Sequence, residues 1–333
     1  MPGSRFFTFT DPFPCQATIR GGDVEICPTA KGNFHANLTH VNLHRLWLQR
    51  LDERLPRICY GAVHPDRAAI EFPFGANQRE FRYRGMEVSP GEIVIDDTDP
   101  VHRKTFGASQ LGAMSLTPAD LASAGRAIVG RELARPSVMR IVRPAPNAMA
   151  HLWALHGEAT VLAKSTPDRL THPEVARSLE EALVHAMIRC LTESTVIDSD
   201  SRALSHTAVI SKLEELLAAN CSQPIYLSEV CAATGVSEST LRRCCYEHVG
   251  MGPIRYLWLR RMHLARAALL RGDAATATVT SIATDHGFWE LGRFSVEYRK
   301  LFGELASTTL GRPPNEQRIF RNRPTDLPVT DFA

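Results

Sequence analysis

Arginine is concentrated in one stretch of the chain. Between residues 241 and 271 there are seven arginines and a single glutamate. A guanidinium group can clamp a phosphate, or hold the O6 and N7 atoms of guanine through two parallel hydrogen bonds. Residues 203–323 carry 15 Lys and Arg against 11 Asp and Glu, whereas the rest of the chain carries 23 against 25. This imbalance indicates an anionic partner for the last third of the chain. Charge alone leaves a solvated helix face open as the alternative.

The elements that must position these arginines are two short helices on either side of Gly235. Residues 227–234 are apolar on one side only, and residues 237–249 place Leu241, Tyr246 and Val249 on their inward face. Ser237 is suited to the N-cap of the second helix, because its hydroxyl can accept from the free amides of the first turn. Helix, glycine turn and capped helix form the helix-turn-helix arrangement.

The same pattern returns 52 residues later, at Gly287. A short helix over 279–284 precedes this glycine, and a helix over 291–301 follows it with Phe294, Tyr298, Leu301 and Phe302 inward. Between the two copies, residues 253–271 predict one helix of about 28 Å. Successive major grooves on one face of DNA lie about 34 Å apart. A rigid helix of this length could therefore set two recognition helices into adjacent turns of a duplex.

Residues 208–310 resemble the AraC/XylS-type bacterial transcription regulators. The resemblance is carried by VCAATGVSESTLRRCCYEHVGMGPIRYLWLRRMHLARAALL in the first copy and by SIATDHGFWELGRFSVEYRKLFG in the second. It implies a DNA-binding module of two helix-turn-helix subdomains, usually fused to a β-barrel sensor or dimerisation domain. Two positions depart from the family pattern. Ala306 stands where many members have Pro, and Trp289 stands where a Ser or Asp cap is common, so the second recognition helix is expected to lack a side-chain cap.

The exposed early positions of the two recognition helices are the candidates for DNA contact. Arginine and the small polar residues there fit base edges, and the alternative for each arginine is a phosphate clamp. The candidates for base contact are Ser239, Thr240, Arg242, Arg243, Glu290, Leu291 and Arg293, with Val296 as a further apolar contact to a thymine methyl group. Glu238 fits a helix cap or a cytosine contact. The candidates for phosphate contact are Ser237, Arg255, Arg260, Arg261 and Arg299, with Arg266 beside them. Gly235 and Gly287 take the turns.

The first part of the chain has a different period. Short alternating runs separated by turn residues predict strands over 33–39, 43–49, 68–74, 80–84, 92–95, 102–106 and 112–116, and residues 84–95 predict a hairpin. Many short strands at even spacing favour a barrel or a sandwich. From Thr117 the pattern predicts helices ending near Val129, then over 146–164 and 173–192. The apolar stripe of the last helix indicates either burial against the β domain or a dimer face.

These patterns predict a multidomain α+β chain. Residues 1–130 form a β-rich, barrel- or cupin-like sensor or dimerisation domain. Residues 131–200 form a helical connector with a possible dimer face, and residues 193–206 are predicted to be a polar interdomain linker. Residues 208–310 form an all-α DNA-binding domain with two helix-turn-helix subdomains joined by a linker helix, and residues 311–333 form a flexible tail. The chain of 333 residues has 44% apolar and 22% charged residues, which is ordinary globular usage.

Composition also argues against other classes of protein. The longest apolar runs are shorter than a membrane span, and the N-terminus lacks the apolar core of a signal peptide, so we expect a cytoplasmic protein associated with the nucleoid. The eight cysteines include no CxxC pair and are expected to be free thiols. His35, His40, His44 and His102 lack the H-x-H spacing of a cupin metal site. Asp96, Asp97 and Asp99 fit a polar turn better than a cation site. No nucleophile elbow or Walker loop is present, so we expect no enzyme and no cofactor.

The functional prediction is a sequence-specific DNA-binding transcription regulator that responds to a small molecule or another signal through its N-terminal domain. Its expected partner is double-stranded DNA, with a small-molecule effector and a homodimer as further possibilities. The family resemblance favours an activator that contacts RNA polymerase over a pure repressor. Two alternatives remain. An enzyme–regulator fusion would carry a metal in its N-terminal barrel, and a nucleoid-type protein would bind any duplex with a steep salt dependence.

Overall fold

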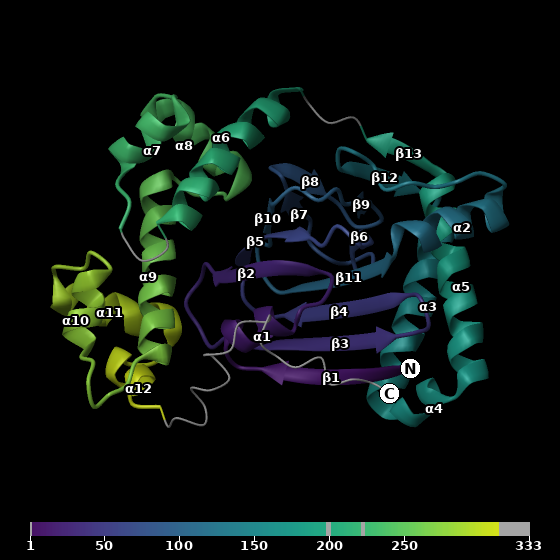
Figure 1. Ribbon diagram of the computed structural model, residues 1–333, viewed down its shortest axis with the longest axis horizontal. Helices are drawn as coiled ribbons and strands as arrows, with labels where there is room; N and C mark the ends of the chain where they lie inside the picture. The colour runs from purple at the N-terminus through teal and green to yellow at the C-terminus, as the bar shows by residue number, and fades with distance from the viewer. Residues whose placement is uncertain (1, 198–200, 221–223, 313–333) are drawn as a thin grey trace.

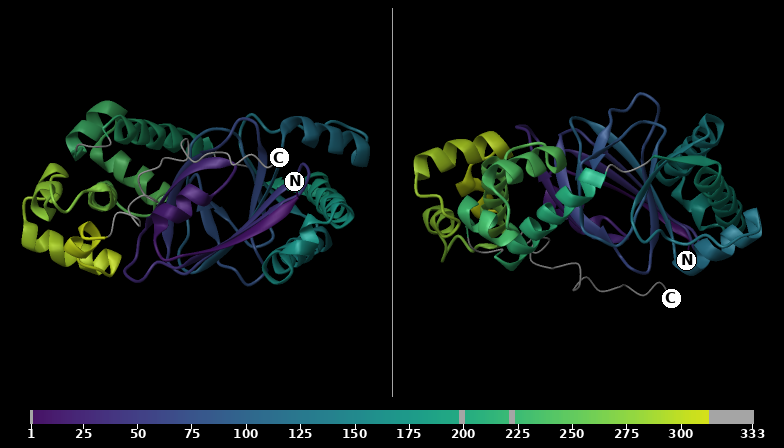
Figure 2. Two further views of the ribbon diagram at one scale, coloured as in Figure 1. Left: turned by 60° about the horizontal axis from the view of Figure 1, so that its bottom comes forward. Right: turned by 90° about the horizontal axis from the view of Figure 1, so that it is seen from above.

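The computed structural model describes residues 2–197, 201–220 and 224–312 (Figure 1). Residues 2–197 form a β domain with helices on one side, and residues 201–312 form a C-terminal helical domain. Figure 2 shows the β sandwich between the C-terminal helical domain at one end and α2–α5 at the other. Within the described residues, no helix is both long enough and apolar enough to cross a membrane. The tail predicted for 311–333 lies outside the described residues from 313 onward.

The strands of the β domain form two sheets. The larger sheet has eight strands in the order β1-β3-β4-β11-β6-β9-β12-β13, and the smaller has five in the order β2-β5-β10-β7-β8. The bounds of the first are β1 Gly3–Phe9, β3 Ala36–Asn42, β4 Trp47–Glu53, β6 Ala68–Pro73, β9 Ile93–Ile95, β11 Ser109–Leu116, β12 Arg140–Pro144 and β13 Ser194–Ile197. The bounds of the second are β2 Gly22–Pro28, β5 Arg57–Val63, β7 Phe81–Tyr83, β8 Met86–Val88 and β10 Val101–Lys104.

Alternation along each strand sends apolar side chains into two different cores. In β3, Leu38 packs with Ile26 and Cys59 of the smaller sheet, whereas Val41 packs with the helices on the other face. Neighbouring side chains of a strand point to opposite faces, so both faces of the larger sheet are buried. The β-rich prediction is confirmed, but the closed barrel is wrong. In the described part of the chain the two sheets stack face to face, and no strand ladder joins them.

Helices cover the outer face of the larger sheet. They are α2 (Pro118–Val129), α3 (Pro146–Ser165), α4 (Pro167–Thr171) and α5 (Pro173–Thr192). Thr117 caps α2 by accepting from Asp120 N, and Gly130 ends it in the left-handed conformation, as the sequence predicts. Leu183 and Met187 of the α5 stripe are fully buried, because this helix packs with α3 over the sheet. The burial interpretation of the stripe therefore holds for its centre, and a dimer face stays a prediction.

Two local predictions need correction. The segment 131–200 is not purely helical, because β12 and β13 extend the larger sheet from it, and β13 occupies part of the predicted linker. The hairpin predicted over 84–95 is also displaced. β8 pairs with β7, and the turn between them is Arg84-Gly85, with φ of 50° and 78°. Two consecutive residues with positive φ are typical of a tight hairpin turn. In the sequence Arg-Gly only the glycine indicates such a turn, because arginine rarely adopts a positive φ.

In the described ranges 201–220 and 224–312, the C-terminal helical domain has seven helices. They are α6 (Ser201–Ala219), α7 (Leu227–Thr234), α8 (Glu238–His248), α9 (Pro253–Arg271), α10 (Val279–Asp285), α11 (Leu291–Phe302) and α12 (Ala306–Leu310). Their shared core includes Leu241, Tyr256, Met262 and Phe294. Cys27 of β2 and Ile58 of β5 belong to the same buried cluster, so the core runs from one domain into the other. A short α1 (Pro12–Thr18) lies beside β2.

Candidate nucleic-acid interface

The first helix-turn-helix unit consists of α7, Gly235 and α8. Gly235 ends α7 with φ of 70°, a conformation that costs a glycine little. The hydroxyl of Ser237 accepts from Thr240 N at 3.3 Å and so caps α8, as the sequence predicts. Leu241 and Val249 are fully buried on the inward face. Tyr246 was predicted inward, but 54% of it is exposed, because Cys244 and Cys245 occupy the buried positions beside it.

The first turns of α8 present their polar side chains to solvent. Glu238, Ser239, Arg242 and Arg243 are exposed, and Thr240 is half-buried. Arg242 donates to Glu238 at 2.8 Å one turn earlier. An ion pair between two exposed side chains contributes little free energy. Arg242 can therefore leave Glu238 for another acceptor at small cost, and all the candidates on this helix share one accessible region.

The second unit consists of α10, Gly287 and α11. Thr278 caps α10 by accepting from Ser281 N at 3.0 Å. Glu290 precedes α11 without a side-chain cap, as the sequence predicts. Phe288 packs on Phe294 with ring centroids 4.9 Å apart and holds the turn against the core. This contact fixes the start of α11 in place of the missing cap.

The early residues of α11 also face solvent. Glu290 and Arg293 are exposed, and the nearest approach between their charged atoms is 3.7 Å. The side chain of Arg293 is 78% exposed, and Trp289 is 81% exposed just before the helix. Leu291 is half-buried against the core and Val296 is exposed. The second unit thus offers one arginine flanked by apolar surface, whereas the first offers two arginines.

The linker helix α9 runs between the two units, with α7 and α8 near one end and α10 to α12 near the other (Figure 1). Of its phosphate candidates, Arg255 is exposed and its guanidinium lies 3.9 Å from the centre of the Trp258 ring. Arg261 is half-buried, and burial lowers the pKa of its guanidinium. Arg299, on α11, is exposed. Together with Ser237 at the start of α8, these residues remain accessible.

Arg260 has a different position from the one the charge pattern suggests. It is only 8% exposed, and its guanidinium lies 2.5 Å from Glu25 of β2 and 3.9 Å from Glu214 of α6. Arg266 is also buried and forms an ion pair with Asp11. In this arrangement neither guanidinium reaches a phosphate. The sequence pattern of α9 shows one apolar face, and it carries no sign that the β domain covers a second face.

A buried polar cluster holds the two domains together beside Arg260. Glu214 accepts from Tyr256 at 2.6 Å and lies 3.0 Å from His102 of β10, all three being buried. Burial alone raises the pKa of the Glu214 carboxyl, but His102, Arg260 and Tyr256 outweigh it and lower this pKa. The carboxylate is therefore ionised at neutral pH and supported by donors from both domains.

The β domain also holds the end of the first recognition helix. Arg82 of β7 donates to the carbonyl oxygens of Tyr246 and Glu247 at 3.1 and 3.3 Å. These carbonyls belong to the last turn of α8, where a cation is favoured by the helix dipole. Glu247 also pairs with His206 of α6. The exposed start of α8 is thus positioned from its opposite end by the β domain.

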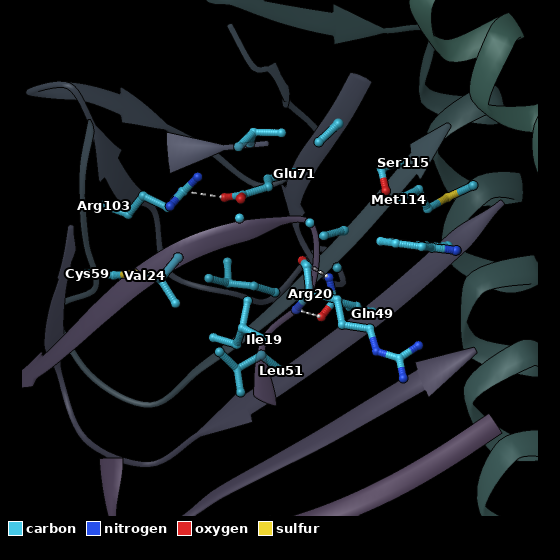
Figure 3. A pocket seen from close by; sticks show the side chains of 18 of the residues that line it. Ile19, Arg20, Val24, Gln49, Leu51, Cys59, Glu71, Arg103, Met114 and Ser115 are labelled. Atoms are coloured by element: carbon cyan, nitrogen blue, oxygen red, sulfur yellow. Dashed lines mark hydrogen bonds and ion pairs between the residues drawn. The ribbon is translucent and has the colours of Figure 1, made fainter. Parts of the chain in front are cut away.

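A cavity of about 90 Å³ lies between the two sheets (Figure 3). Ile19, Val24, Leu51 and Met114 supply apolar surface, and most of the polar lining groups already have protein partners. Glu71 pairs with Arg103 at 2.8 Å, and the Gln49 side chain exchanges two hydrogen bonds with the backbone of Arg20. The cavity offers a small, mainly apolar space. It is a feature that the alternation of the strands does not predict.

The structure also shows the surroundings of Asp96 and Asp97, for which the sequence left a cation site and a polar turn as alternatives. Asp97 receives two hydrogen bonds from Arg84, at 2.8 and 2.9 Å, and accepts from Met139 N. Asp96 lies 3.7 Å from Arg103. Both aspartates therefore anchor the turn after β9, in agreement with a polar turn.

The family model that matches this chain lies in the C-terminal helical domain. A family model described as a helix-turn-helix domain matches residues 230–312. Over 193 residues the chain is 28% identical to a probable thc operon regulatory protein of Rhodococcus erythropolis, with 56% of each chain covered. Over 102 residues it is 33% identical to the XylDLEGF operon transcriptional activator 2 of Pseudomonas putida, covering 31% of this chain and 62% of that protein. The chain thus spans little more than half the length of these relatives.

A solved structure is also similar to part of the chain. A probable AraC family transcriptional regulator from Rhodopseudomonas palustris is 33% identical, and the match covers 32% of this chain and 98% of that one with a TM-score of 0.29. The two helix-turn-helix units of the structure agree with the matching family model. In its C-terminal helical domain, the chain is similar to transcriptional regulators of the AraC family.

Proposed function

We propose that this protein is a sequence-specific DNA-binding transcription regulator. The observation that carries the proposal is the pair of helix-turn-helix units joined by α9, each with exposed arginine on the first turns of its second helix. Arg242 and Arg243 of the first unit and Arg293 of the second are assigned to base edges, with Ser239, Thr240, Glu290 and Leu291 beside them. Ser237, Arg255, Arg261 and Arg299 are assigned to phosphates.

The regulator is proposed to be an activator. The relatives from Pseudomonas putida are named as transcriptional activators, and they match about a third of this chain. An activator on DNA must meet RNA polymerase, so RNA polymerase is its proposed protein partner. A homodimer is compatible with this proposal but is not required for affinity, because one chain already carries two DNA-binding units.

The signal is proposed to be a small, mainly apolar molecule bound in the cavity between the sheets. The apolar side chains of Ile19, Val24 and Met114 and the volume of about 90 Å³ support this assignment. Because the polar groups of Gln49 and Glu71 already have partners, an apolar ligand would leave no new buried polar group unsatisfied. The proposed activity is regulatory rather than enzymatic.

The test is selection of genomic fragments by the purified full chain at about physiological salt. We expect a shared asymmetric motif. The triple variant Arg242→Ala, Arg243→Ala, Arg293→Ala should lose it, whereas Arg177→Ala, which removes an exposed arginine on α5, should keep it. Enrichment of no motif by the wild-type chain contradicts the proposal, and equal retention of all fragments with a steep salt dependence would identify a non-specific binder instead.

A further inference from the structure

One segment of the β domain contacts both the cavity and the linker helix. It runs from Asp11 through α1 and the following loop to the end of β2 at Pro28, and we call residues 11–28 the coupling segment. Ile19, Arg20 and Val24 of this segment line the cavity (Figure 3). Asp11 and Glu25 of the same segment hold arginines of α9. The coupling segment is therefore placed between the proposed effector site and the proposed DNA-binding domain.

Two consecutive residues of β2 face the cavity and the linker helix α9 respectively. Val24 lines the cavity, whereas the Glu25 carboxylate lies 2.5 Å from the guanidinium of Arg260. Successive side chains of a strand point to opposite faces, so a shift of the strand at Val24 also moves Glu25. The residue that lines the cavity and the residue that contacts α9 are therefore adjacent in the sequence.

The two contacts with α9 differ in burial, because Arg260 is buried but the side chain of its partner Glu25 is 34% exposed. Asp11 and Arg266 form an ion pair in which each residue is buried, and Arg266 also pairs with Glu304 at 2.7 Å. Separation would leave Arg266 with Glu304 and leave Asp11 with only the more distant Arg312, so each buried charge would be less well compensated, which opposes separation. When the coupling segment moves, α9 is therefore expected to follow, because separation costs more than a joint displacement.

The coupling segment is internally stiff. Gln16 of α1 accepts from Ile26 N of β2 at 2.9 Å, and Cys15 is fully buried under both. At the cavity end, the backbone of Arg20 is fixed by two hydrogen bonds with Gln49. Gly22 lies so close to β5 that a Cβ there would stand 2.3 Å from the carbonyl oxygen of Ala62. A segment held in this way transmits a displacement at one end to the other.

We propose that the coupling segment transmits occupancy of the cavity to the linker helix α9 through the ion pairs Asp11–Arg266 and Glu25–Arg260. This inference rests on the proposed function. A displacement of α9 changes the relative placement of the two helix-turn-helix units, because one unit is near each end of that helix (Figure 1). Cavity occupancy then sets whether both units match adjacent turns of one DNA face.

A second route between the domains exists and must be separated from this one. Arg103 of β10 lines the cavity, and its neighbour His102 reaches Glu214 and Tyr256. That route does not use Asp11 or Glu25. A substitution of these two carboxylates therefore interrupts the coupling segment and leaves the β10 contacts in place.

The test measures amide hydrogen exchange of α9 in the full chain without DNA. Cavity occupancy is imitated by Ala113→Leu, which adds bulk at the cavity wall on β11, and the wall is loosened by Val24→Ala. Each is made in the wild-type chain, in the double variant Asp11→Asn with Glu25→Gln, and in Asp23→Asn. Asp23 is an exposed carboxylate on the same strand and is the matched control. Arg266 and Arg260 keep Glu304 and Glu214 as partners in the double variant.

We expect the cavity substitutions to change the exchange rates of α9 by about threefold or more in the wild-type and Asp23→Asn chains, and to change them much less in the double variant, in which only the β10 contacts remain. If the double variant does not fold, Asp11→Asn and Glu25→Gln are tested singly, and each should reduce the effect. An unchanged α9 after both cavity substitutions, or an equal change with and without the two carboxylates, overturns the inference. Failure of the proposed function is recognised by a different result, namely that the full chain selects no DNA motif.

Discussion

Arg266 of the linker helix and Asp11, which caps the first helix of the chain, form an ion pair in which both side chains are buried. They are 255 residues apart in the sequence. The charge pattern of the last third of the chain assigns such an arginine to an anionic partner outside the protein. In the folded chain its partner is a carboxylate of the β domain. This relationship makes the contact between the two domains a determinant of stability and places it on the proposed path of regulation.

The Asp11–Arg266 pair should contribute strongly to stability. Asp11→Ala removes the cap of α1 and leaves Arg266 with Glu304 alone, so we expect a loss of about 3 kcal/mol in the free energy of unfolding. Asp23→Ala removes an exposed carboxylate nearby and should change it by less than about 0.5 kcal/mol. Urea unfolding measures both. Equal losses in the two variants would show that the interdomain pair contributes nothing particular.

Stability should depend on pH through buried histidines, of which His263 on α9 gives the clearest test. Burial, helped by Arg266 and Arg260, lowers the pKa of His263 from 6.5 to about 3. The unfolded chain therefore binds a proton below about pH 6.5 that the folded chain does not bind, and this contribution to stability is lost as the pH falls. His263→Gln should reduce the slope of unfolding free energy against pH by about 1 kcal/mol per pH unit near pH 5.5. His151→Gln, at an exposed position, should leave the slope unchanged. The same slope in all three proteins would contradict the assignment.

The two groups of arginines should affect DNA binding differently. Arg242→Ala removes a proposed base contact, so it should relax sequence preference at one position and weaken binding by about 1–3 kcal/mol. Arg299→Ala removes a proposed phosphate contact, so it should weaken binding to all sequences and reduce the slope of log K against log salt by about one. Fluorescence anisotropy titrations over a range of salt concentrations separate the two effects. A salt slope lowered by Arg242→Ala, with preference unchanged, would reassign that residue to a phosphate.

Arg260→Ala should behave unlike Arg299→Ala, although both residues were expected at phosphates. Arg260 is buried against Glu25 and Glu214, so its loss should lower the unfolding free energy by about 3 kcal/mol and leave the salt slope of DNA binding unaltered. Thermal unfolding and the same titrations measure the two quantities. A salt slope reduced by about one in Arg260→Ala would show that the domains separate on DNA and release this side chain.

The parts of the account that sequence could predict are local. Ser237 as a cap, Gly235 as a left-handed turn and the prolines that open α2, α3 and α9 each act within one helical turn, so their residue types are sufficient. The missing cap of α11 was predictable for the same reason.

The parts that sequence could not predict depend on contacts between distant elements. Arg260 and Arg266 look like solvated or DNA-facing arginines until β2 and α1 are placed against α9. β12 and β13 join the edge of the larger sheet from a segment whose pattern is mainly helical, so the sequence does not reveal these two strands. The apolar ring of Tyr246 favours an inward position in the sequence, but its neighbours Cys244 and Cys245 fill the core and Tyr246 is exposed.

The most direct test of the central claim is a footprint of the full chain on a selected DNA fragment. We expect two protected blocks on one face of the duplex, with centres about 10 base pairs apart. Arg242→Ala with Arg243→Ala should remove one block, and Arg293→Ala should remove the other, while Arg177→Ala leaves both. A single block, or two blocks that weaken together in every arginine variant, would contradict the claim that each helix-turn-helix unit occupies its own groove.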